Sequence, residues 1–333
     1  MPELQLSRLR QEVGKVACEL ELYEQFIEKL RCPICKCRLQ RADSSFTCES
    51  ASCGATFPII DGVPTLINES NSILSLDMYE SRTAIYFKQG EFKHRVARKL
   101  PKIDHNLKAR ENYGEFARYL SKRNHQPKVL VIGGGVLGQG MESITSTELL
   151  FINSDIALVP GIQIIVDAHD IPFEDETFDG IIAQAVLEHV ADPYRCVAEM
   201  RRVLKEEGLV YAEAAFMQQV HGGGVDFTRF THLGLRRLFR GFHEISSGAC
   251  CGPGMALAWS LQHFLLSFTT NRILRIFFKG MSSLFLFPLK YFDYLLIDKP
   301  SALDAASALY FMGKKSDRIL QDRELVKQYR GAA

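Results

Sequence analysis

A series of short apolar runs in the second half of the chain constrains its fold more than any other feature. The runs are residues 129–132, 149–152, 162–166, 180–184 and 209–214, and segments long enough for a turn or a helix separate them. Apolar strands that alternate with helices are typical of a parallel sheet that is covered on both faces. The pattern therefore predicts an α/β fold.

A glycine-rich loop directly follows the first of these runs. Gly133, Gly135 and Gly138 have the spacing G-x-G-x-x-G, and missing side chains at this place let a cofactor lie against the backbone. Asp155, about 20 residues further on, suits the ribose of such a cofactor. The loop by itself fits a nicotinamide-dependent dehydrogenase as well as it fits a methyltransferase.

Four motifs further along the chain decide between these two classes. In chain order they are DAHDIPF at residues 167–173, FD at 178–179, VLEHV at 186–190 and EMRRVLKEEG at 199–208. Their order and spacing resemble the type 11 group of class I S-adenosylmethionine-dependent methyltransferases, which act on small molecules. The resemblance covers about residues 128–245, and it implies a Rossmann-like sheet with helices on both faces.

The same resemblance implies a set of cofactor-binding residues. Asp155 would accept hydrogen bonds from the ribose hydroxyls, since a carboxylate can take two at once, and Asp167 would receive the adenine amino group. The glycines would line the methionine part of the cofactor. The full set is Gly133, Gly135, Gly138, Asp155, Asp167, Ala168, His169 and Gln184.

The chain departs from the family pattern at two places. Val131 stands where many relatives have an acid, and the glycine loop has one extra residue before Gly138. Asn153 is an alternative to Asp155 as the ribose ligand. His189 is expected to be a structural residue at the start of a helix rather than a base.

Cysteines gather in a short segment near the N-terminus. Five of the nine lie between Cys32 and Cys53, and two thiol pairs on two turns are typical of a tetrahedral zinc site. We expect Cys32, Cys35, Cys48 and Cys53 to hold one structural Zn²⁺, with Cys37 as a competing thiol. The alternative is a cluster of thiols without metal. Residues 30–67 resemble the small zinc-ribbon proteins that accompany or precede methyltransferases.

These observations divide the chain into four parts. We expect an N-terminal helix over residues 1–30, a zinc-ribbon-like module over 31–67, a helical linker and first helix over 68–127, and the methyltransferase domain over 128–333. The N-terminus lacks the apolar run of a secretory signal, so the expected location is cytoplasmic.

The loop after the fifth apolar run carries candidate catalytic residues. Methyl transfer to an alcohol is an in-line displacement that needs a base near the acceptor. His221 is the candidate base and Asp226 its orienting partner, because this loop lies at the carboxyl edge of the sheet, where ligands bind. Alternatively, Asp226 pairs with Arg229 to hold the loop, and His221 is solvated.

Residues 254–297 form a sizeable apolar insertion where this fold normally has a short turn. Arg272, Arg275, Lys279 and Lys290 interrupt its aromatic and aliphatic residues, so no run is long enough to span a membrane. The mixture suits helices that lie at a membrane surface or cover an apolar substrate. The alternative is packing on the catalytic core or on a second subunit in a homodimer.

The predicted function is methylation of a hydroxyl on a small-molecule, glycan or lipid-linked acceptor. One alternative is a ribosomal RNA methyltransferase whose zinc ribbon grips RNA. A formal charge of +1 disfavours it, because nucleic-acid binding needs clustered basic residues. The other alternative is a scaffold that has lost catalysis, for which Val131 and the irregular glycine loop would be the signs.

Overall fold

The computed structural model describes residues 24–81, 101–122, 126–136, 138–145 and 147–332. The expected N-terminal helix lies outside these ranges up to residue 23, and residues 24–27 are helical. Phe26 in this segment stacks on Phe178 with ring centroids 5.8 Å apart. The end of the N-terminal segment therefore packs on the central sheet.

The central sheet has the strand order β7-β6-β5-β8-β9-β11-β10. Five parallel strands in the order 3-2-1-4-5 are the core of a doubly wound Rossmann-like fold, so the predicted fold class is confirmed. Only β11 is antiparallel to its two neighbours. The strands are β5 (Lys128–Ile132), β6 (Leu150–Asp155), β7 (Ile164–Val166), β8 (Phe178–Gln184), β9 (Leu204–Ala215), β10 (Phe242–Cys251) and β11 (Ala308–Lys315).

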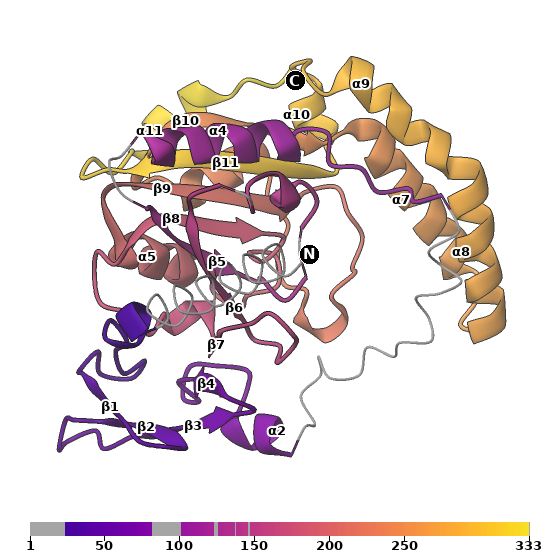
Figure 1. Cartoon of the computed structure of the whole chain (residues 1–333). Coiled ribbons are helices and arrows are strands. Elements are labelled where there is room, and N and C mark those ends of the chain that lie inside the picture. Colours follow the sequence, from indigo (N-terminus) through magenta and orange to yellow (C-terminus); the bar gives the residue numbers. More distant parts are fainter. Residues whose placement is uncertain (1–23, 82–100, 123–125, 137, 146, 333) are drawn as a thin grey trace, which may run out of the picture.

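Helices cover both faces of this sheet (Figure 1). Successive side chains of a strand point to opposite faces. Val129 and Val131 therefore pack in one core with α4 (Ala109–Ser121), while Leu130 and Ile132 belong to the other core. That second core holds α5 (Pro193–Val203) and α6 (His232–Leu238). Short 3-10 helices occur at η2 (Met141–Ser143), η3 (Ala168–Asp170) and η4 (Gly223–Val225).

The cysteine-rich module is a small antiparallel meander that continues the central sheet (Figure 1). Its last strand pairs in parallel with β7, through Thr65 with Ile165 and Leu66 with Val166. Asn68 then donates a buried hydrogen bond of 3.0 Å to the carboxylate of Asp170. The module is β1 (Leu39–Arg41), β2 (Ser45–Cys48), β3 (Thr56–Ile60) and β4 (Val63–Leu66), followed by α2 (Leu76–Glu80).

The insertion between β10 and β11 is helical. α7 (Pro253–Ser267) and α8 (Arg272–Leu286) form a hairpin that extends away from the sheet (Figure 1). The Asp293 carboxylate accepts the first backbone N–H groups of α7, from Gly254 at 2.6 Å and Met255 at 3.0 Å. Within the described ranges, no helix is both long and apolar enough to cross a bilayer. The remaining helices are η5 (Phe287–Phe292), α9 (Asp293–Leu296), α10 (Ala302–Ala305), α11 (Asp322–Leu325) and η6 (Val326–Gln328).

Candidate active site

A cavity of about 450 Å³ lies at the carboxyl ends of the parallel strands. Six of the predicted cofactor residues line it: Gly133, Gly135, Asp155, Asp167, Ala168 and His169. Gly138 and Gln184 instead line a second cavity of about 30 Å³, together with Asn153. The structure thus places six of the eight predicted cofactor residues around the large cavity and the other two around the small cavity. Asp155 faces the large cavity and its rival Asn153 does not.

Two glycines of the loop after β5 have positions that a side chain could not occupy. Gly133 has a φ of 75°, and a Cβ there would lie 2.4 Å from the Val186 Cγ2 atom. A Cβ on Gly135 would lie 2.7 Å from the Asp155 Oδ2 atom. The loop can therefore pass close to Val186 and to the acid at the end of β6 only because these side chains are missing.

The Asp155 carboxylate accepts two backbone hydrogen bonds and can still accept hydrogen bonds from a ligand. Its Oδ2 atom accepts the Gly135 N–H and its Oδ1 atom accepts the Ala157 N–H, both at 2.8 Å. Burial raises the pKa of this carboxyl above its ordinary value, although the backbone hydrogen bonds oppose the rise. Each carboxylate oxygen has two lone pairs, so each can accept one more hydrogen bond. These residues fit the two hydroxyls of a ribose.

Asp167 has a different set of partners. Its Oδ1 atom accepts from the His169 backbone N–H at 3.0 Å and from the His169 Nδ1 atom at 2.5 Å, and the Ser72 hydroxyl donates to Oδ2 at 2.5 Å. Burial acts to raise the pKa of Asp167, but these hydrogen bonds outweigh it and lower the pKa. Oδ2 retains a lone pair for an amino group.

His169 positions Asp167 by using both of its ring nitrogens. Its Nε2 atom accepts the Asp192 backbone N–H at 3.0 Å, so Nδ1 carries the proton that Asp167 receives. Sequence reasoning missed Ser72, because the polar segment after the module carries no motif. Ser72 lies next to Ile73 and Leu74, which line the large cavity.

The large cavity is also lined by His189, His221, Gly222 and Val225. The His221 side chain is 25% exposed, and burial lowers its pKa, which favours the neutral imidazole. Its Nδ1 atom hydrogen-bonds to the Gln219 carbonyl at 3.1 Å. The neutral ring therefore keeps a lone pair on Nε2.

The expected orientation of His221 by Asp226 needs correction. The Asp226 carboxylate lies 3.7 Å from the imidazole Nδ1 atom and instead accepts the backbone N–H groups of His221 at 2.8 Å and Gly222 at 2.9 Å. It also pairs with Arg229. Asp226 therefore orders the loop backbone, as the alternative interpretation proposed, while the Gln219 carbonyl orients the ring.

His189 also differs from expectation. It lies in the turn after β8 rather than at the start of a helix. The helix α5 begins at Pro193, because the Asp192 side chain caps it by accepting the Arg195 N–H. His189 instead borders the large cavity, with its ring centroid 4.8 Å from that of His221.

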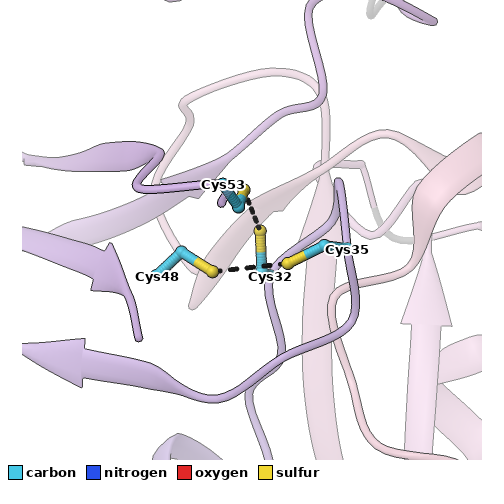
Figure 2. A group of neighbouring side chains, drawn as sticks. All are labelled: Cys32, Cys35, Cys48 and Cys53. Atoms are coloured by element: carbon cyan, nitrogen blue, oxygen red, sulfur yellow. Dashed lines mark hydrogen bonds between the residues drawn. The ribbon is translucent and has the colours of Figure 1, made fainter. Parts of the chain in front are cut away.

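The four predicted metal ligands converge in the N-terminal module (Figure 2). The sulfur atoms of Cys32 and Cys53 are 3.8 Å apart, and those of Cys35 and Cys48 are 3.3 Å apart. Tetrahedral zinc with Zn–S bonds of about 2.3 Å needs sulfur atoms about 3.8 Å apart, so the thiols fit the ion. A backbone N–H from Cys37 lowers the pKa of Cys35 to about 7, which favours a thiolate. The Cys37 thiol itself stays outside the group of four.

One family model matches the chain. Residues 150–212 match the model described as "Methyltransferase domain", a segment that runs from β6 into β9 and includes Asp155 and Asp167. The match agrees with the four sequence motifs and with the strand order. The predicted enzyme class, a methyltransferase, is therefore confirmed by the match over residues 150–212.

Several solved structures resemble part of the chain. A complex between the Haloferax volcanii Trm112 methyltransferase activator and a putative methyltransferase matches with 15% identity and a TM-score of 0.41, covering 65% of this chain and 92% of that one. A putative sarcosine dimethylglycine methyltransferase from Galdieria sulphuraria matches with 17% identity and a TM-score of 0.39, covering 63% and 89%. An S-adenosylmethionine-dependent methyltransferase from Archaeoglobus fulgidus matches with 14% identity and a TM-score of 0.38, covering 62% and 94%. No curated protein matches the chain in sequence.

Proposed function

We propose that this chain transfers a methyl group from S-adenosylmethionine to a hydroxyl of a hydrophobic or lipid-linked acceptor. The observation that carries the proposal is the set of side chains that line the large cavity. The Asp155 and Asp167 carboxylates and the His221 imidazole all line it. A donor bound at the carboxylates and an acceptor bound at the histidine would therefore share one space.

The cofactor supplies an electrophilic methyl group, and the protein's residues bind and orient it. Asp155 would accept the ribose hydroxyls and Asp167 the adenine amino group, each through a lone pair that the protein leaves unused. Gly133 and Gly135 would admit the rest of the cofactor along the loop. Gly138 and Gln184 stay predictions, at the second cavity.

The acceptor proton would be removed at His221. Neutral imidazole is a suitable proton acceptor near physiological pH, and hydrogen bonding of Nδ1 leaves Nε2 for this role. Asp226 would contribute by holding the loop that carries His221. With its proton removed there, the acceptor oxygen would be held for in-line attack on the methyl group that the cofactor supplies.

The hydrophobic character of the acceptor is inferred from the α7–α8 hairpin, which contacts the loop that carries His221. Trp259 of α7 lies 5.8 Å from the His221 ring, and Gln219 donates to Ser260 at 3.1 Å. The next helix, α8, buries only Ser282 among its residues and leaves Ile273 77% exposed and Phe285 64% exposed. Packing on the catalytic core thus leaves most of this apolar helix uncovered.

The charges on the hairpin favour a membrane surface as the partner of α8. Arg272 and Lys279 occur on the same helix as the exposed apolar side chains. Apolar residues that enter the acyl boundary, together with basic ones that meet anionic head groups, are typical of a helix lying in a membrane surface. We propose peripheral membrane contact through α8, with a homodimer through the same face as the alternative outcome.

We also propose that Cys32, Cys35, Cys48 and Cys53 bind a structural zinc ion. Their sulfur spacing and their distance from the cavity residues in sequence support this role. The ion would hold the two turns that carry these residues, and through them the strand that pairs with β7.

The proposed reaction is tested with S-adenosylmethionine labelled in the methyl group and a total membrane lipid extract. We expect label to enter the organic-soluble fraction with the intact protein. The His221→Ala variant should retain cofactor binding in calorimetry and lose most label transfer. Label that enters RNA or only water-soluble products would refute the hydrophobic acceptor.

A further inference from the structure

Three side chains with metal-binding groups lie close together beside the large cavity, and two of them, His189 and His221, line it. Glu188, His189 and His221 each offer one ligand atom, and these atoms lie within 4.8 Å of one another. They come from two separate segments, the turn after β8 and the loop after β9. Two histidines and one carboxylate are a common ligand set for divalent transition metals.

The hydrogen bonds of the two histidines leave the ring nitrogens that a metal needs. His189 contacts the Val225 carbonyl through Nδ1 at 2.9 Å, and His221 contacts the Gln219 carbonyl through Nδ1 at 3.1 Å. A carbonyl oxygen can only accept, so the proton of each neutral ring is on Nδ1 and the lone pair is on Nε2. Metal-binding histidines generally donate their other N–H group in this way.

Glu188 adds an independent sign of a missing partner. Glu188 is 1% exposed, and its Oε1 atom accepts the Ala215 N–H at 3.3 Å. Its Oε2 atom has no hydrogen-bond partner in the part of the chain that the structure describes. A buried oxygen without a partner is costly, and a cation would satisfy it.

The backbone also makes room for this arrangement. A Cβ on Gly222 would lie 2.5 Å from the Nδ1 atom of His189, so only glycine lets the loop approach the ring this closely. The approach sets the two imidazole rings 4.8 Å apart at 85°. Arg229 in the same loop pairs with Asp226.

We infer that Glu188, His189 and His221 form a binding site for one divalent transition-metal ion, with the remaining coordination position open to the cavity. A three-ligand site of this kind accepts water or a substrate oxygen at the open position. It is separate from the cysteine cluster in both ligands and location.

The role of the ion rests on the proposed function. A hydroxyl that binds the open position would become more acidic and release its proton to water. Its oxygen would then form a bond to the methyl carbon as the carbon–sulfur bond breaks. The products are the methyl ether, S-adenosylhomocysteine and one proton. His221 is a ligand in this metal-bound form and removes the proton only when the metal is absent.

Cobalt is a suitable probe, because thiolate and histidine sites give Co²⁺ different spectra. The full-length protein, with its cysteine site filled with zinc, is freed of weakly bound metal and titrated with Co²⁺. We expect one equivalent to bind with weak d–d absorption and without thiolate-to-cobalt charge transfer. Glu188→Gln and His221→Ala should each weaken this binding at least about 100-fold. His243→Ala, at an exposed residue on β10, serves as the control and should bind like the unaltered protein.

Two results would overturn the site: no cobalt beyond the cysteine cluster in the unaltered protein, or equal binding by all four proteins. Circular dichroism identifies any variant that fails to fold, and Glu188→Gln preserves the shape of the buried side chain. The methyl-transfer assay is read separately. Cobalt binding without methyl transfer refutes the proposed reaction and leaves the site, whereas methyl transfer without cobalt binding refutes the site alone.

Discussion

Replacement of Asp155 by alanine tests how the cavity binds its cofactor. The carboxylate holds Gly135 and Ala157 through hydrogen bonds of 2.8 Å and has one lone pair left on each oxygen for the ribose. Loss of a charged hydrogen-bond acceptor costs about 1.5–3 kcal/mol. We therefore expect the Kd for S-adenosylmethionine to rise by about 10- to 150-fold.

Isothermal titration calorimetry measures this change, and Asn153→Ala is the matched control. Asn153 lies two positions earlier on β6 but borders the small cavity, so its removal should leave the Kd within about 2-fold, which corresponds to about 0.4 kcal/mol. A larger effect for Asn153 than for Asp155 would refute the assignment of the ribose ligand. Tight binding of a nicotinamide dinucleotide by the unaltered protein would refute the cofactor class.

Three other predictions concern the rest of the molecule. Elemental analysis should find zinc in protein purified without chelator, and no zinc in the unaltered protein would refute the site. The Cys53→Ser variant should lose the zinc, and the Cys37→Ser variant should keep it. Changing Phe277 and Phe285 to serine should weaken co-sedimentation with anionic vesicles at least about 10-fold, since each exposed ring would contribute about 1.5–3 kcal/mol on burial. If the unaltered protein is a dimer that binds no lipid, and this variant is a monomer, the result would favour the subunit interface. The pKa of Asp226 lies well below its ordinary value, because its hydrogen bonds and ion pair outweigh burial. Its contribution to stability is therefore present above about pH 4 and lost as the pH falls further, and urea unfolding of Asp226→Asn at pH 7 should show a loss of about 1–3 kcal/mol.

The central sheet could be predicted from the sequence because its signals are local. Each parallel strand is a short apolar run; Asp155 ends one of them, and the motifs that contain Asp167 and Glu188 follow the next two. The carboxyl ends of parallel strands meet at one edge, so the cavity follows from strand order. The two thiol pairs were predictable for the same reason, since each pair lies on one turn.

The contacts that the sequence did not reveal join distant segments through small or polar groups. Ser72 donates a hydrogen bond to Asp167 through its hydroxyl, and no periodicity in the sequence predicts this contact. Gly138 lies against Gln184, where a Cβ would be 1.4 Å from the Oε1 atom, because the loop turns back toward that side chain. Gln184 itself donates to the buried Glu213 at 2.8 Å, and only the fold brings these side chains together.

Asp226 illustrates a choice that the sequence leaves open. The residue can pair either with His221, five positions earlier, or with Arg229, three positions later. The loop conformation decides between them, because both backbone N–H groups at its start point to the Asp226 carboxylate. The remaining oxygen positions are then taken by the guanidinium group of Arg229.

The pairing of β4 with β7 also determines how the chain can be divided. A shortened chain that begins after residue 67 would lose β4 and leave Ile164, Ile165 and Val166 on an uncovered edge of the sheet. An open apolar edge with free N–H and C=O groups recruits strands from other molecules. The boundary that looks natural in the sequence would therefore yield an aggregating catalytic fragment, and co-expression of the missing N-terminal piece should restore its solubility.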